Sequence, residues 1–236
     1  MLTNFETILS EIKKPRENIF IFNFKLTDPQ TIDFLPGQYI ILKVPKGNAY
    51  APRLYSIFSS NKIKDQFQLL VEIIPGGLAS TYFLNLKVSD KVEFQGPLGQ
   101  FVLRQNDREK FFLVTGSGIA PVFSILQSFN LPVDRYQIYW GLKSYQSLYL
   151  FEELKKYNPK ICLSREQNLE IIPEDSRKYF SLGRIDSCFD KFILDTKYEI
   201  LNTDYYLCGR KDITESLRLF LLAKNIPQEQ IFFEKF

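Results

Sequence analysis

Short runs of β-branched and aromatic residues, separated by turn-forming residues, fill the first hundred positions of the chain. Such runs favour strands, whereas proline and glycine interrupt them. The expected strands are residues 5–11, 18–26, 38–44, 53–58, 66–74 and 91–95, with Pro15 among the expected turn residues. One short helix, at about residues 80–86, interrupts the series. Six strands at this spacing predict a small closed antiparallel β-barrel of Greek-key type.

The pattern changes after Arg104. Short apolar strands are expected at residues 111–115, 136–140, 160–164, 204–208 and 231–233, and helices at about 121–129, 148–157 and 213–224. This alternation predicts βαβ units, and therefore an α/β doubly wound parallel sheet. The polar residues 105–110 are the expected linker. They separate a first domain, residues 1–104, from a second domain, residues 111–236.

Composition and charge narrow the class of protein. The chain of 236 residues is 45% hydrophobic and 24% charged, as in a folded globular protein. Its formal net charge of +3 does not indicate a nucleic-acid partner, although a local basic patch for an acidic protein remains compatible with it. No apolar stretch is long enough to span a bilayer, and the first ten residues do not resemble a signal peptide. A cytoplasmic location is therefore expected.

Histidine is absent from the whole sequence. This excludes Ser-His-Asp and Cys-His catalysis and most zinc and haem sites. The three cysteines, Cys162, Cys188 and Cys208, are scattered, which argues against a disulfide framework and an iron–sulfur cluster. No metal site is expected, and any chemistry must be carried by something other than an imidazole.

The octet at residues 53–60 places a cation, a phenol and a hydroxyl close together in an expected strand. Side chains alternate along a strand, so Arg53 and Tyr55 share one face and Ser56 opens onto the other. A guanidinium in this setting can bind a phosphate while the ring covers a flat ligand. The octet is equally compatible with an ordinary half-buried strand.

Two glycine pairs precede helices. Residues 115–121, Thr-Gly-Ser-Gly-Ile-Ala-Pro, follow the first strand of the second domain and open its first helix, a setting that favours a bound pyrophosphate over a simple tight turn. Pro121 suits a first helical turn. Residues 76–80, Gly-Gly-Leu-Ala-Ser, enter the helix of the barrel. They can bind a second phosphate, or form a turn in which Ser80 is only an N-cap.

Two further pairs end strands of the second domain. Cys208-Gly209 lies where ligands of open α/β sheets gather, although a lone cysteine is more often a buried apolar residue. Ser164-Arg165 can bind the 2′-phosphate of NADPH, or form an ordinary solvated loop.

Taken in order, these motifs resemble those of the ferredoxin–NADP⁺ reductase family of FAD/NAD(P)-binding flavoprotein oxidoreductases. The resemblance rests on Arg-Leu-Tyr-Ser at 53–56, Gly-Pro-Leu-Gly-Gln-Phe at 96–101, the motifs at 115–121 and 208–209, and the ending Glu-Lys-Phe at 234–236. It covers nearly the whole chain. The stand-alone form of this family, without an iron–sulfur domain, is expected.

The resemblance implies roles for individual residues. Arg53 would hold the FAD pyrophosphate, Tyr55 would lie against the isoalloxazine and Ser56 would bond near flavin N5. The other implied FAD contacts are Leu54, Leu70, Val71, Glu72, Gly77, Leu78, Ala79 and Ser80. Those implied for the nicotinamide nucleotide are Thr115, Gly116, Gly118, Pro121, Ser164, Arg165, Cys208 and Gly209. The implied catalytic residues are Ser56, Cys208, Glu234 and Phe236.

The implied function is an NADPH-dependent reductase, with NADPH preferred to NADH, that passes electrons through FAD to a separate ferredoxin- or flavodoxin-like carrier. The alternatives are an NAD(P)H:flavin or quinone reductase, the reductase component of an oxygenase, and, in a different class, a non-catalytic flavin-binding sensor or assembly module. Two departures stand out. The loop at 74–80 lacks the tyrosine that plant-type members place on the adenine, and Phe236 replaces their terminal tyrosine.

Overall fold

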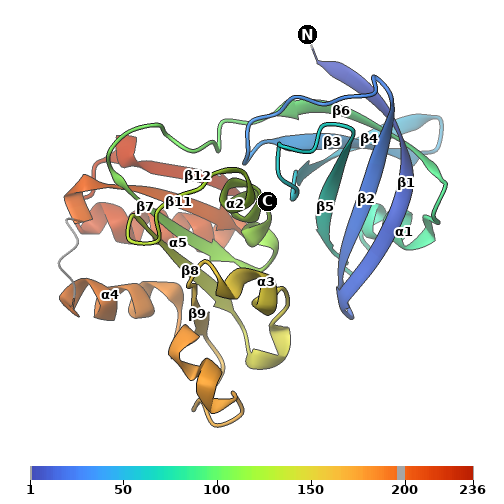
Figure 1. The fold of residues 1–236 in the computed structure, drawn as a ribbon. Coiled ribbons are helices and arrows are strands. Elements are labelled where there is room, and N and C mark those ends of the chain that lie inside the picture. Colours follow the sequence, from blue (N-terminus) through green and yellow to red (C-terminus); the bar gives the residue numbers. More distant parts are fainter. Residues whose placement is uncertain (1, 196–199, 236) are drawn as a thin grey trace. The chain divides into compact units, whose positions relative to one another are not determined.

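Two units make up the chain. The computed structural model describes residues 2–195 and 200–235. Its contacts group Met1–Leu103 with Ala120–Asn130 in the first unit, and Arg104–Ile119 with Leu131–Phe236 in the second. Each unit contains a six-stranded sheet, and Figure 1 shows both. The limits predicted for the domains and the linker stay a prediction.

The first sheet is antiparallel throughout, as predicted. Its strands are β1 (Thr3–Arg16), β2 (Ile19–Asp28), β3 (Tyr39–Lys46), β4 (Ala49–Ser56), β5 (Gln66–Glu72) and β6 (Lys91–Leu98). Their order, β4-β3-β6-β1-β2-β5, is that of a Greek-key barrel. Helix α1 (Leu78–Asn85) is the helix expected within the barrel. Phe22, Phe24, Phe67 and Phe94 are almost fully buried and form the aromatic centre of its core.

The barrel is closed at one point and not along the full length of its edge strands. Strands β4 and β5 are the two edges of the sheet. They are joined by a bridge between Ile57 and Leu69, where the Phe58 N–H also donates to the Gln68 carbonyl at 2.8 Å. The prediction of an antiparallel barrel is therefore correct, but β4 and β5 are joined by a single bridge and not by a continuous ladder.

Pro15 does not end the first strand. Strand β1 continues to Arg16, with a shift of register between Lys13 and Arg16. Strand β1 pairs with β6 only as far as Ile8, so beyond that residue β2 is its only partner among the described strands. A proline at an irregularity with one strand partner costs little, because a missing N–H there breaks no regular ladder. The expected turn at Pro15 was wrong for this reason.

Helix α2 (Ile119–Ser128) packs against residues 58–61 within the first unit. The Ser124 hydroxyl donates to the Ser59 carbonyl at 2.7 Å, and the Gln127 amide donates to the Phe58 carbonyl at 3.1 Å. The rings of Phe58 and Phe123 are stacked, with centroids 4.7 Å apart. The helix is thus fastened to the segment that directly follows the Arg-Leu-Tyr-Ser motif.

The second sheet is parallel, as predicted. Its strands are β7 (Glu109–Thr115), β8 (Tyr136–Leu142), β9 (Lys160–Leu163), β10 (Phe180–Leu182), β11 (Thr203–Gly209) and β12 (Ile231–Lys235), in the order β10-β9-β8-β7-β11-β12. The α-helices of this unit are α3 (Phe151–Lys155), α4 (Ile185–Asp195) and α5 (Lys211–Ala223). Short 3₁₀ turns are η1 (Gly116–Gly118), η2 (Tyr145–Ser147), η3 (Glu174–Tyr179), η4 (Ile200–Asn202) and η5 (Gln228–Gln230).

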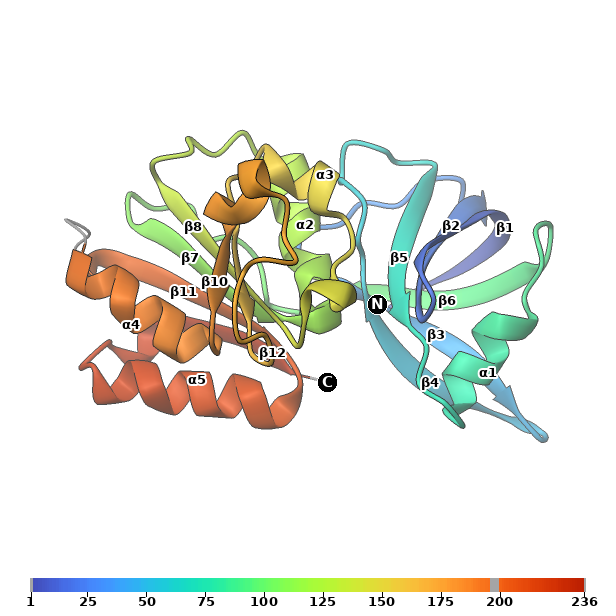
Figure 2. The same ribbon diagram turned by 90° about the horizontal axis from the view of Figure 1, so that it is seen from below.

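Both faces of this sheet are covered (Figure 2). Phe111, Leu113 and Tyr205 pack with residues of α4 and α5 in one buried cluster. Trp140 follows Tyr139 on β8 and so lies on the opposite face, where its ring meets that of Tyr149, just before α3. Central strands buried on both faces are typical of parallel sheets.

Four segments of the second unit differ from prediction. Strand β10 and helix α4 were not predicted, and neither was the turn η3 that precedes β10. The helix expected at 148–157 is reduced to Phe151–Lys155. Leu150 immediately before it has a left-handed backbone, with φ of 54°, so the helical turn cannot continue backwards through this residue.

A buried ion pair anchors the start of β7. Asp204 of β11 is fully buried and accepts hydrogen bonds from Lys110 at 2.9 Å, Asn106 at 2.9 Å and Arg108 at 3.4 Å. Lys110 is itself 5% exposed. Burial lowers the pKa of Lys110, although Asp204 opposes this shift. Residues expected to form a polar linker are thus fixed to the neighbouring strand.

Candidate functional site

Arg53 and Tyr55 project on the same side of β4, as the alternation predicts. They pair with Leu42 and Ile40 of β3, whose side chains are fully buried in the barrel core. Directly opposite residues of an antiparallel pair project on the same side of a sheet. The two expected flavin residues therefore lie on the core side of an edge strand, and Ser56 lies on the other side.

Tyr55 is fixed by packing, whereas Arg53 is exposed. The Tyr55 ring meets Phe83 of α1 edge-on, with centroids 5.1 Å apart. Burial raises the pKa of Tyr55 to about 12, with Arg53 opposing the shift, so the phenol is neutral at physiological pH. The Arg53 guanidinium donates to the Pro52 carbonyl at 2.8 Å. A fixed ring beside an accessible guanidinium suits a flat ligand that carries phosphate.

The edge of β5 continues this surface. Beyond the bridge between Ile57 and Leu69, no described strand pairs with the second edge of β4 or of β5. The expected backbone contacts Leu70, Val71 and Glu72 lie in this part of β5. Such an edge presents main-chain groups to a ligand instead of to another strand. Leu54 of β4 is 56% exposed.

The entry to α1 supplies a second set of donors. Gly76 has a φ of 73°, and Gly77 is the N-cap residue, with no side-chain capping bond. The hydroxyl of Ser80 accepts the Ile74 N–H at 2.9 Å, so Ser80 lies inside the first turn and is not the N-cap. The amides of Leu78, Ala79 and Ser80 belong to this first turn, where helix geometry leaves N–H groups available to an anion.

The two motifs of the second unit meet at the point where the strand order reverses. Strands β8, β9 and β10 follow on one side of β7, whereas β11 and β12 lie on the other. A β-carbon added to Gly118 would lie 2.4 Å from the Cys208 carbonyl oxygen, and one added to Gly209 would lie 2.2 Å from the Thr115 hydroxyl. Only glycine permits this approach. Ligands of open α/β sheets bind at such a reversal point, outside the carboxyl ends of the strands.

Other expected nucleotide residues belong to the same segments of the chain or pair with them. Gly116 has a φ of 50°, a conformation that favours glycine. Pro121 is the third residue of α2, within its first turn as expected. Cys208 of β11 is paired with Glu234 of β12. Cys208 is 2% exposed, and burial, together with the Glu234 carboxylate, raises the pKa of its thiol. The neutral thiol is therefore the form present at neutral pH. Phe236 lies outside the described residues.

Ser164 and Arg165 lie at the same carboxyl edge, after β9. Both are exposed. Their N–H groups donate to the carbonyls of Leu142 at 3.0 Å and Lys143 at 2.8 Å, which ties this loop to the end of β8. The Glu166 carboxylate accepts the Tyr145 N–H at 2.9 Å. The hydrogen bond from Arg165 to Lys143 also brings a second exposed cation, Lys143, beside Arg165. Sequence reasoning missed Lys143, although it directly follows strand β8.

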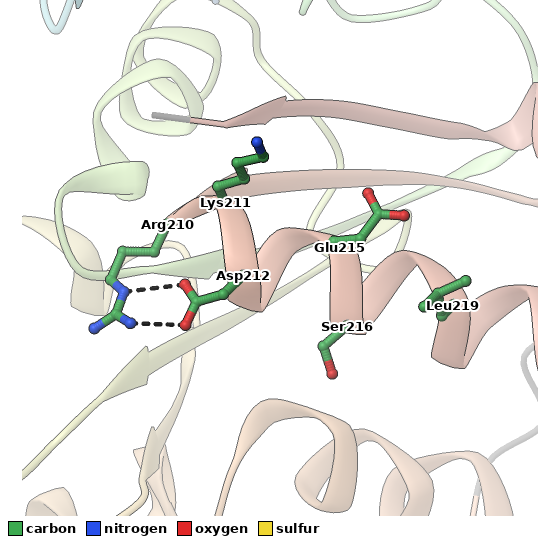
Figure 3. A pocket seen from close by; sticks show the side chains of 6 residues that line it. All are labelled: Arg210, Lys211, Asp212, Glu215, Ser216 and Leu219. Atoms are coloured by element: carbon green, nitrogen blue, oxygen red, sulfur yellow. Dashed lines mark hydrogen bonds and ion pairs between the residues drawn. The ribbon is translucent and has the colours of Figure 1, made fainter.

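A surface hollow of about 680 Å³ lies along α5 (Figure 3). Its lining begins at Arg210, directly after Gly209, and includes Lys211, Asp212 and Leu219. The guanidinium of Arg210 binds the Asp212 carboxylate through two hydrogen bonds, of 3.1 and 2.7 Å. The charge of Arg210 is therefore balanced by Asp212, and Lys211 is a second cation in the lining.

Two family models match the chain. An oxidoreductase FAD-binding domain matches residues 6–103, and an oxidoreductase NAD-binding domain matches residues 112–218. The chain belongs to the FAD/NAD(P)-binding oxidoreductases of the ferredoxin–NADP⁺ reductase family. It is an NAD(P)H-dependent FAD oxidoreductase. The FAD-binding domain lies within the first unit and includes strand β4.

Relatives of this oxidoreductase include the toluate 1,2-dioxygenase electron transfer component of Pseudomonas putida, which is 26% identical over 98% of this chain and 67% of its own length. The propane 2-monooxygenase reductase component of Mycolicibacterium smegmatis is 24% identical over 100% of this chain and 68% of its own. The chain thus spans about two thirds of the length of these relatives.

Solved structures share the fold of the oxidoreductase. A ferredoxin NADP⁺ reductase from Neisseria gonorrhoeae with bound FAD and NADP has a TM-score of 0.81 at 20% identity, over 99% of this chain and 98% of that one. A cytochrome P450 reductase from Amycolatopsis has a TM-score of 0.82 at 22% identity, over 100% of this chain and 70% of that one.

The donor set of the oxidoreductase fits its cofactors. The exposed guanidinium of Arg53 and the amides that open α1 suit a pyrophosphate, and the close packing at Gly118 and Gly209 brings two motifs together at the strand-order reversal, where ligands of such sheets bind. Within the described part of the chain, no group of three potential metal ligands is found. No described helix has the length and apolarity to span a membrane.

Proposed function

We propose that this oxidoreductase takes a hydride from NADPH and passes electrons singly, through FAD, to a separate ferredoxin- or flavodoxin-like carrier. The observation that carries the proposal is the meeting of the Thr115–Gly118 and Cys208–Gly209 motifs at the reversal point of an NAD-binding sheet. The same chain contains an FAD-binding domain. Binding domains for a hydride donor and for a cofactor that can separate its two electrons are thereby joined in one chain.

FAD supplies both the two-electron and the one-electron chemistry when it is bound, which is why no imidazole is needed. In this proposal Arg53 and the first-turn amides of α1 hold the pyrophosphate, Tyr55 covers the isoalloxazine and Ser56 donates a hydrogen bond to it. Cys208 and Glu234 lie beside the nicotinamide. The raised pKa of Cys208 supports a packing role, because a neutral thiol is a weak nucleophile.

The preference for NADPH rests on the loop after β9. Arg165 is exposed, and its N–H donates to the Lys143 carbonyl. The Ser164 hydroxyl donates to the Leu142 carbonyl at 3.2 Å and so helps to hold this loop. Two cations, Arg165 and Lys143, at the nucleotide edge of the sheet suit the 2′-phosphate that distinguishes NADPH from NADH.

The nature of the acceptor is suggested by the relatives. They are named as the electron transfer component of a dioxygenase and the reductase component of a monooxygenase. This favours, as a second candidate function, the reductase component of an oxygenase. Both candidates require an external one-electron acceptor, and they differ in which acceptor is reduced.

Anaerobic titration of the purified protein tests the proposal. We expect a yellow protein whose flavin absorbance bleaches with NADPH faster than with NADH, and whose reduced form then reduces a ferredoxin or a flavodoxin. Rapid reduction of an oxygenase component alone would support the second candidate. A protein without flavin, or flavin that neither nucleotide bleaches, would contradict both candidates and favour a non-catalytic flavin-binding module.

Replacing Arg165 with alanine is expected to raise KM for NADPH by about tenfold or more and to leave KM for NADH unchanged. Hydrogen bonds to a charged group contribute about 1.5–3 kcal/mol, and about 1.4 kcal/mol corresponds to tenfold. Steady-state kinetics with both nucleotides provide the measurement.

Arg184→Ala is the matched control, since Arg184 is another exposed arginine of the same unit and pairs with Asp186 at 3.6 Å. It should leave both values of KM unchanged. An equal rise in KM for NADPH and for NADH in the Arg165→Ala variant would contradict a contact with the 2′-phosphate.

A further inference from the structure

The indole of Trp140 donates a hydrogen bond of 3.0 Å to the carbonyl of Gly116, the first glycine of the nucleotide motif. Trp140 lies on β8, beside β7, and is fully buried. Its ring is held edge-on by Tyr149, with centroids 4.9 Å apart and an interplanar angle of 87°. The donor is therefore fixed by packing before any ligand arrives.

This bond does more than satisfy a buried carbonyl. The Gly116 oxygen also accepts the N–H of Ile119, so the indole is its second donor. Two donors fix the direction of the carbonyl. A peptide bond is planar and trans, so fixing this oxygen also fixes the direction of the N–H of Ser117, which points the opposite way. The orientation of the whole Gly116–Ser117 peptide is thus set from β8.

We propose that Trp140 is a positioning residue for the nicotinamide nucleotide: it holds the Gly116–Ser117 peptide in the orientation that the phosphate-binding loop needs. Gly116 has a φ of 50°, and glycine in this region has many alternative conformations. A loop ordered in advance binds more tightly, because less ordering is required on association. The inference rests on the proposed function only in placing the nucleotide at this loop.

The chain contains a single tryptophan, so an amino-acid analogue supplied to a tryptophan auxotroph replaces Trp140 and no other residue. Benzothienylalanine keeps the size and shape of the side chain but has sulfur in place of the indole N–H. 4-Fluorotryptophan keeps the N–H and is the matched control. The Kd values of NADP⁺ and NAD⁺ are measured by calorimetry, beside FAD content, Tm and the limiting rate of flavin reduction.

The benzothienyl protein is expected to bind the preferred nucleotide about threefold to tenfold more weakly, the range for one neutral hydrogen bond. FAD content and the limiting rate should be unchanged, and the fluorotryptophan protein should match the parent. An unchanged Kd would overturn the inference. A parallel fall in FAD content, limiting rate of flavin reduction and nucleotide affinity would also overturn it, because that result indicates a general disturbance of the fold. Calorimetry needs no turnover, so failure of the proposed reaction remains distinguishable from failure of this inference.

Discussion

FAD binding is expected to weaken by about a hundredfold or more when Arg53 is replaced by alanine. A guanidinium that binds a pyrophosphate bidentately makes two hydrogen bonds to a charged group, each contributing about 1.5–3 kcal/mol. The side chain is exposed and donates to the carbonyl of the adjacent Pro52, so its loss should not unfold the barrel. Fluorescence titration of the apoprotein with FAD gives the change in Kd.

Riboflavin serves as the control ligand, because it has the isoalloxazine but no phosphate. Its affinity should be equal in the parent and in the Arg53→Ala variant. If riboflavin weakened as much as FAD, Arg53 would act on the ring site or on folding, and its assigned role would be wrong.

Ser56→Ala is the matched control protein from the same strand. Ser56 is 9% exposed and projects on the opposite side of β4 from Arg53. The variant should retain FAD, while reduction by NADPH slows about tenfold, as expected for one lost hydrogen bond. Stopped-flow measurement of flavin bleaching separates the two effects, and loss of FAD here would place Ser56 in binding instead.

Replacing Asp204 with alanine is expected to lower the free energy of unfolding of the second unit by about 3–5 kcal/mol. This is the usual cost of removing one member of a buried ion pair, because the other charge stays buried without compensation. Lys110 is that charge, and burial already lowers its pKa despite the carboxylate. Urea unfolding followed by the fluorescence of Trp140 reports on the unit that contains the pair.

Two further variants test whether the uncompensated charge of Lys110 causes this loss of stability. Asp204→Leu combined with Lys110→Leu removes both charges, and should recover most of the lost stability, since apolar replacements of buried pairs are often neutral. Asp212→Asn breaks the exposed pair with Arg210, whose side chains are 68% and 63% exposed, and should leave the urea midpoint unchanged. A midpoint unaffected by Asp204→Ala would show that burial of the pair has no net effect.

The sequence was informative wherever local pattern decides structure. Period-two alternation around Arg53 and Tyr55 predicted their common face, and glycines between a strand and a helix predicted the loop at Gly116 and Gly118. The conformations of these segments depend mainly on steric limits that act within a few residues. The prediction that Cys208-Gly209 lies at a ligand-binding strand end needed only the order of strands and helices.

Other features depend on partners far away in the chain. Helix α4 has Ile185, Cys188 and Phe189 at helical spacing, a signal that was overlooked because a long polar stretch precedes it. The three-residue strand β10 has too few residues to show a period. The polar residues 105–110 resemble a linker in sequence, because Asp204, the buried partner of Lys110, lies 94 residues later in the chain. The hydrogen bond from Trp140 to Gly116 likewise joins two strands, which local periodicity does not report.

The packing of α2 determines how the protein can be divided. A truncated chain that stops at residue 103, the end of the FAD-domain match, would lose residues 120–130 from the first unit. The ring of Phe58, now 3% exposed and stacked on Phe123, would be uncovered, and the carbonyls of Phe58 and Ser59 would lose their donors. The compact unit around the Arg-Leu-Tyr-Ser motif is discontinuous in sequence, so an FAD-binding module transplanted into another protein should include this helix.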